Sequence, residues 1–237
     1  MRMSLWVLLV LLPGLGGERL NAQPRIEFPE GSTIDLGTLY RGDVKTRAVS
    51  ITNTGTDTLF VEHVKASCGC TGTMISTPRI APGGTGVLRL TLDTRNLSGS
   101  VTKTVTIVSK SPENRTTSIQ LMATVREEIV LRPQQFWFKD AEVGKKSIAE
   151  VLLRNAGSDT LRLTGYRATL EGLSVDVPRM PLAPGSEVLL VAAFTPGRAM
   201  PVVADAIFLL TSNARQPEVY VPVFGNAKEF RFDQTGP

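Results

Sequence analysis

The sequence has little of what hydrolytic enzymes use. It contains one histidine, two cysteines and 6% aromatic residues among 237 positions. A hydrolytic site needs a nucleophile, a base and a group that orients the base, but the sequence shows no serine elbow, no glycine loop that could hold phosphate and no facing pair of carboxylates. We therefore expect no enzymatic activity of this kind, and thiol redox chemistry at the two cysteines is the one reaction class left open.

Clustered positive charge is also missing. The net charge is +4, and basic residues occur singly or as the pair Lys145 and Lys146, mostly between threonine, valine and leucine. A nucleic-acid surface would need basic residues gathered on one face. We predict solvated strand faces and no nucleic-acid partner.

No apolar run is long enough to cross a membrane. The longest N-terminal run, Leu5 to Leu12, is far shorter than the ~20 residues of a spanning helix. With Arg2 before it and small residues up to Ala22 after it, the run is typical of an export signal. We predict a signal peptide over residues 1–22, a periplasmic or secreted mature chain with net charge +3, and no transmembrane or lipid anchor in that chain.

The rest of the chain repeats itself. "TNTGTDTL" at 52–59 matches "RNAGSDTL" at 154–161, and "IAPGG" at 80–84 matches "LAPGS" at 182–186, both at an offset of 102 residues. One offset over separated landmarks indicates two copies of a domain of ordinary size. We place copy one at 24–125 and copy two at 129–230, joined by "REE" at 126–128, where Glu127 and Glu128 are expected to face solvent.

Both copies show the period of β-strands. Apolar residues alternate with polar ones in "VTKTVTIV" at 101–108, and turn signals recur every 8 to 12 residues or so. Asparagine and glycine in "NTG" and "NAG" are expected to reverse the chain with positive φ, and proline with glycine in "APGG" and "APGS" to form a second turn. We predict an all-β fold of two tandem immunoglobulin-like antiparallel β-sandwiches, each with seven or eight strands.

Copy one carries a recognisable order of landmarks. "ITNTGTDTLFVEHVKASCGCT", then "IAPGGTGVLRLTLDT" and "GSVTKTVTIVS", resembles the bacterial domain family of unknown function numbered fifteen seventy-three, which is similar to Hydin-type and major sperm protein domains. The resemblance implies an exported immunoglobulin-like sandwich and brings no established activity. Copy two departs at the signature, where "TLEGL" at 169–173 stands in place of "SCGCT".

The two cysteines, Cys68 and Cys70, are separated by one glycine, and three hypotheses remain open for them. They are small, partly buried residues that pack at a tight turn; or they form a small, easily reduced disulfide that suits redox exchange; or they bind Cu(I) or Zn(II) together with His63. Copy two has no cysteine at this turn, so the fold itself does not require them.

Three consecutive aromatic residues, Phe136, Trp137 and Phe138, stand out in copy two. In a strand, neighbouring side chains point to opposite faces, so we expect two of them to pack inward and Trp137 to lie at the surface or the domain joint. They form either inter-domain packing or a patch that docks a partner. The aromatic residues, together with exposed sheet edges that can add a strand, favour a non-catalytic interaction or scaffold protein that binds an unidentified protein. The alternative is a thiol redox or copper- or zinc-handling accessory protein.

Overall fold

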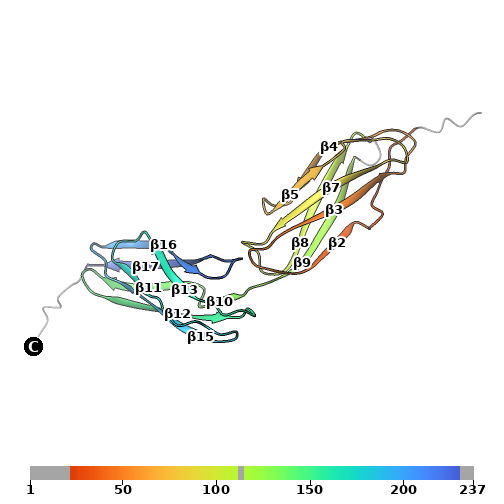
Figure 1. The fold of residues 1–237 in the computed structure, drawn as a ribbon. Coiled ribbons are helices and arrows are strands. Elements are labelled where there is room, and N and C mark those ends of the chain that lie inside the picture. The colour runs from red at the N-terminus through yellow and green to blue at the C-terminus, as the bar shows by residue number, and fades with distance from the viewer. Residues whose placement is uncertain (1–21, 112–114, 230–237) are drawn as a thin grey trace, which may run out of the picture.

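The computed structural model describes residues 22–111 and 115–229, and within these ranges the protein is all-β (Figure 1). The strands form two successive β-sandwiches, which confirms the predicted fold class. No helix in the described part of the chain is long and apolar enough to cross a membrane. The predicted signal peptide lies almost entirely outside the described residues.

The first sandwich contains two sheets. Sheet one has the order β1 (Ile26–Glu27), β3 (Val44–Asn53), β7 (Thr85–Asp93), β5 (Thr71–Ile75). Sheet two has the order β2 (Thr33–Tyr40), β9 (Thr116–Arg126), β8 (Gly99–Ser109), β4 (Leu59–Ala66), β6 (Arg79–Ile80).

The second sandwich repeats this plan. One sheet has the order β10 (Ile129–Arg132), β12 (Ser147–Asn155), β15 (Glu187–Phe194), β14 (Leu173–Asp176). The other has the order β11 (Phe136–Glu142), β17 (Glu218–Lys228), β16 (Met200–Thr211), β13 (Leu163–Ala168).

Each sandwich contains one parallel strand pair, which the sequence did not predict. These pairs are β2 with β9 and β11 with β17, and all other pairs are antiparallel. They arise where the chain crosses between sheets, because β1 and β10 lie in one sheet of their sandwich and β2 and β11 lie in the other.

The alternating side chains fill a separate core in each sandwich. Val101, Val105 and Ile107 of β8 are buried in the first core. Their counterparts 102 residues later, Val203, Ile207 and Leu209 of β16, are buried in the second. Burying apolar area at about 25 cal/mol per Å² is the main force that holds each pair of sheets together.

Asparagine side chains, and not positive φ, shape the "NTG" and "NAG" turns. Asn53 is fully buried, and its Nδ2 donates to the carbonyls of Asp57 (2.7 Å) and Ile80 (2.9 Å) while its Oδ1 accepts from the amide of Gly55 (3.1 Å). Gly55 does not have positive φ, so that part of the expectation is wrong. In the second turn, Asn155 Nδ2 likewise donates to the carbonyls of Asp159 and Leu182, and its Oδ1 accepts from the amide of Gly157.

The "APGG" and "APGS" turns form as predicted. Gly83 and Gly185 have φ of 72° and 79°, a region that glycine enters without steric cost. The amide of Gly84 donates to the carbonyl of Ala81 at 2.8 Å, and Ser186 to Ala183 at 3.0 Å. These contacts close four-residue turns with proline at the second position and glycine at the third.

Candidate functional sites

Cys68 and Cys70 are joined by a disulfide in the loop between β4 and β5. Their Cα atoms are 5.3 Å apart, within the range that a disulfide needs. Because β4 and β5 belong to different sheets, the loop carries the chain from one face of the first sandwich to the other. Of the three hypotheses for this pair, the structure therefore shows the disulfide.

The second sandwich makes the same loop without sulfur. The amide of Thr71 donates to the carbonyl of Cys68 at 3.3 Å, and 102 residues later Leu173 donates to Leu170 at 3.3 Å. In the same way, Asp93 donates to the carbonyl of Cys70 and Thr195 to that of Gly172, each at 2.9 Å. The disulfide is therefore an addition to a turn that the backbone already defines.

The surroundings of the disulfide are half apolar and half polar. Both cysteines are half-buried, and Cys70 packs against a small core cluster containing Leu39, Leu92 and Ala123. Thr71 Oγ1 lies 3.6 Å from Cys68 Sγ and 3.9 Å from Cys70 Sγ, so one buried hydroxyl contacts both sulfurs.

Asp93, whose amide donates to the carbonyl of Cys70, forms an ion pair with Arg95. The side-chain hydrogen bond from Arg95 lowers the pKa of Asp93, although burial acts in the opposite direction. The same contact with Asp93 raises the pKa of Arg95. Both groups are therefore charged at neutral pH, beside the backbone that holds Cys70.

His63 is not gathered with the cysteines. It is exposed on β4, opposite Val108 of β8. Within residues 22–111 and 115–229, no three histidine, cysteine, aspartate or glutamate side chains lie close enough to hold a metal ion. The Cu or Zn hypothesis remains a prediction for which the described residues supply no ligand set.

Phe136, Trp137 and Phe138 alternate across β11 as expected from strand geometry. Phe136 and Phe138 are buried in the second core, where Phe138 packs against Phe194 with ring centroids 5.4 Å apart. Trp137 is 55% exposed and lies beside Phe224 of β17, with ring centroids 6.3 Å apart.

Two further aromatic side chains continue this surface, the half-buried Phe208 and the exposed Tyr220. Phe208 of β16 and Tyr220 of β17 are opposite each other in the register, and their ring centroids are 5.6 Å apart. We call Trp137, Phe208, Tyr220 and Phe224 the aromatic face. The matched positions of the first sandwich hold mostly small or polar residues, namely Asp35, Thr106, Ser118 and Met122.

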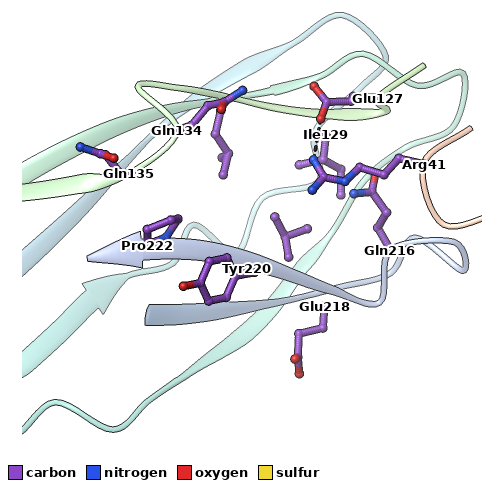
Figure 2. Close-up of a pocket in the computed structure, with 11 residues that line it drawn as sticks. Arg41, Glu127, Ile129, Gln134, Gln135, Gln216, Glu218, Tyr220 and Pro222 are labelled. Carbon is purple, nitrogen blue, oxygen red and sulfur yellow. Dashed lines mark hydrogen bonds and ion pairs between the residues drawn. The ribbon is translucent and has the colours of Figure 1, made fainter. Parts of the chain in front are cut away.

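A pocket of about 280 Å³ lies where the two sandwiches meet (Figure 2). Gln216 lines it, is 8% exposed, and has a buried side-chain oxygen with no hydrogen-bond partner. Arg41 Nη1 and Glu127 Oε1 form an ion pair of 2.5 Å at the pocket. Sequence reasoning missed the pocket because its walls come from segments far apart in the chain: Arg41, Glu127, Ile129, Leu131, Gln134, Gln135, Gln216, Glu218, Val219, Tyr220 and Pro222.

Glu128 corrects one prediction, since it is buried and not solvated. It is 4% exposed, and its carboxylate accepts from Arg215 Nη1 at 3.2 Å and from Asn213 Nδ2 at 2.9 Å. Arg215 also binds Asp43 of the first sandwich at 3.0 Å and covers the ring of Tyr40 at 4.8 Å. Burial lowers the pKa of Arg215, but the carboxylates of Glu128 and Asp43 outweigh it and raise that pKa above its ordinary value.

The fold places the protein among immunoglobulin-like β-sandwich proteins. Residues 26–125, which span the first sandwich, match the family model described as "Protein of unknown function (DUF1573)". No curated protein matches the sequence.

Three solved structures show distant similarity. A protein of unknown function from Porphyromonas gingivalis W83 is 18% identical, with 85% of this chain and 96% of that chain covered and a TM-score of 0.35. The YadV chaperone is 15% identical, with 85% and 99% covered and a TM-score of 0.32. The ASH / PapD-like domain of human CEP192 is 13% identical, with 44% and 87% covered and a TM-score of 0.37. Scores this low assign no function to this chain.

Proposed function

We propose that the protein is an exported, non-catalytic interaction or scaffold protein whose second sandwich holds a protein partner on the aromatic face. The observation that supports this most is the exposure of Trp137, Tyr220 and Phe224, at 55%, 58% and 36%. Large exposed aromatic side chains grouped on one surface are typical of protein contacts, since each buries much apolar area on binding.

The first sandwich provides an internal comparison. The same fold is built there with Asp35, Thr106 and Ser118 at three of the four matched positions. The aromatic residues of the second sandwich are therefore not needed to form the sheet. A binding role accounts for their exposure, which has no benefit for folding.

The aromatic face is tested by site-specific crosslinking in the producing cell. A photoreactive phenylalanine analogue at Trp137 should capture one defined protein. The alanine variant Phe224→Ala should reduce capture at least tenfold, because interface aromatics of this kind carry ~2 kcal/mol or more. Met122→Ala, at the position in the first sandwich that matches Phe224, is the control and should leave capture unchanged. Equal capture by a probe placed at Asp35 would contradict the proposal.

Export is tested separately by cell fractionation. The chain in the periplasmic or secreted fraction should begin at Gln23, because the small residues before it suit signal cleavage. A protein that keeps residues 1–22 and stays with the cytoplasmic fraction would show that this part of the proposal is wrong.

A second candidate function, thiol redox exchange, is favoured by the disulfide of Cys68 and Cys70. A bond added to a turn that already forms without it serves structure little, and closing so short a loop constrains the unfolded chain weakly. In this function the disulfide accepts two electrons and two protons from a dithiol donor, giving two thiols and an oxidised donor. A thiol count with and without reductant should show reversible two-electron behaviour that Cys68→Ser removes. Metal analysis of the purified protein tests the copper or zinc alternative.

A further inference from the structure

Among the residues that the structure describes, the first half of β17 has no neighbouring strand on one of its two sides. β17 lies between β16 and β11, but β11 begins to pair only at Phe136, opposite Val223. In the described part of the chain, no strand lies on the β11 side of the stretch from Glu218 to Pro222.

The hydrogen-bond pattern shows which backbone groups face this open side. The amide of Thr211 donates to the carbonyl of Pro217 at 2.9 Å, in register with the antiparallel pairing of β16 and β17. Since antiparallel strands bond at every second residue, Val219 and Val221 bond to β16. The N–H and C=O groups of Glu218 and Tyr220 therefore point away from β16, and we call these four groups the open edge.

Proline lengthens the open side of β17 by one residue compared with β9 of the first sandwich, whose stretch from Thr116 to Ile119 also has no described strand on its β2 side. In the first sandwich, the amide of Gln120 donates to the carbonyl of Ser32 at 2.8 Å, and the parallel ladder begins at that level with Thr33 opposite Gln120. Pro222 occupies the position that matches Gln120 and has no N–H to donate. The carbonyl of Gln134, which matches Ser32, thus lacks this donor, and the ladder begins one residue later.

The pocket at the joint runs along this open edge. Residues of β17 line one side, while Gln134 and Gln135 line the other (Figure 2), and Ile129 and Leu131 of β10 also line the pocket. Its charged residues are already paired, Arg41 with Glu127 and Glu218 with Arg167. The pocket is therefore close to neutral, and its lining combines the amide side chains of Gln134, Gln135 and Gln216 with apolar side chains such as Ile129 and Leu131.

We propose that this pocket binds an extended, uncharged peptide segment of a partner protein, which adds as a strand to the open edge of β17. The inference rests on the proposed function, because it names the chemistry of a partner segment. Main-chain groups of the peptide bind those of Glu218 and Tyr220, and its inward side chains contact Ile129 and Leu131. The peptide also supplies an N–H donor near the side-chain oxygen of Gln216, which has none in the free protein.

A peptide fits these groups better than a neutral saccharide does. The open edge presents donors and acceptors at the regular spacing of a strand, which only another main chain matches along its length. An amide side chain buried without a donor likewise favours a ligand rich in N–H groups.

The proposal is tested with random octapeptides displayed on phage and selected against the purified protein. Selected sequences should be uncharged and alternate apolar with polar residues. Hydrogen exchange then gives a direct measurement. In the free protein the amides of Glu218 and Tyr220 should exchange much faster than those of Val219 and Val221, and bound peptide should slow them at least tenfold.

Two variants test the cause. Pro222→Gln restores the donor found at Gln120, extends the ladder with β11 by one residue onto the carbonyl of Gln134, and so occupies the end of the site next to Tyr220, which should weaken peptide binding at least tenfold. Gln216→Met removes the unpartnered oxygen and should weaken binding while raising the melting temperature. Gln120→Ala keeps its amide in the first sandwich and should leave affinity unchanged.

Several outcomes overturn the inference. Selected peptides that leave the Glu218 and Tyr220 amides unprotected, or that bind Pro222→Gln equally well, exclude strand addition at this edge. If the selection yields no peptide and a neutral oligosaccharide slows exchange at the same amides, the pocket binds sugars and the inference is wrong. Crosslinking at Trp137 is independent of these results, so the proposed function can stand where this inference fails.

Discussion

Asn53 and Asn155 each use one buried amide to join three backbone segments. In both, Nδ2 donates to two carbonyls, and Oδ1 accepts from the glycine amide two residues later in the same turn. A buried carbonyl without a donor costs about 1–3 kcal/mol, so the energetic value of such a residue lies mainly in what its loss would leave unsatisfied.

Replacement of Asn155 by alanine should therefore destabilise the second sandwich strongly. We expect the free energy of unfolding to fall by about 2–4 kcal/mol, because the carbonyls of Asp159 and Leu182 lose their donor together. Urea unfolding of the full chain measures it. The exposed neighbour Thr160→Ala is the control, and a similar small change in both variants would show that water replaces the amide without cost.

Gln216 is the opposite case, a buried amide oxygen that has no partner. Gln216→Met keeps the side-chain volume and removes the unsatisfied group, so we expect stability to rise by about 1–2 kcal/mol. Thermal unfolding of the free protein checks this. A loss of stability would mean that the amide already makes a contact that the thioether cannot replace.

At the level of elements, the loop with Cys68 and Cys70 can be compared with its sulfur-free counterpart. The Cys68→Ser, Cys70→Ser double variant should keep the fold and lose no more than about 2 kcal/mol, because a ring closed over three residues removes little chain entropy. Denaturant unfolding measures the loss, and wild type with reductant should match the variant. A much larger loss would make the disulfide a structural staple after all.

Local sequence patterns predicted the strands and their buried faces well. Contacts between residues far apart in the chain could not be predicted from such patterns. The period of two in β8 and the burial of Phe136 and Phe138 follow from strand geometry alone. The burial of Glu128 depends on Arg215, a residue 87 positions away. The pocket likewise brings together Arg41 and Gln216, and no motif or spacing in the sequence predicts that these two residues lie close together.

For the whole molecule, the joint between the sandwiches is held by a few close contacts. Arg215 of the second sandwich binds Asp43 and covers Tyr40 of the first. Gly42 has φ of 98°, and a Cβ there would lie 2.0 Å from the carbonyl oxygen of Arg215. Only glycine permits this approach, so the backbones of the two sandwiches meet directly at Gly42.

Arg215→Ala should have two effects: it should loosen the joint between the sandwiches and lower the free energy of unfolding. It removes the link to Asp43 and leaves the buried carboxylate of Glu128 with Asn213 as its remaining side-chain partner. Because the Arg215 side chain is 41% exposed, water replaces part of what is lost, and we expect the free energy of unfolding to fall by about 1–3 kcal/mol. Small-angle scattering should show a broader range of inter-sandwich distances, and urea unfolding the lower stability.

A second substitution separates charge from contact at this joint. In Arg215→Ala, Glu128→Gln, no buried charge remains unpaired, so stability should recover in large part while the scattering stays broadened, because the link to Asp43 is still absent. Arg47→Ala, which removes an exposed ion pair with Glu30 within the first sandwich, should change neither measurement. Full recovery of both stability and the narrow distance distribution would mean that Arg215 only neutralises Glu128, and that the backbone contact at Gly42 fixes the arrangement alone.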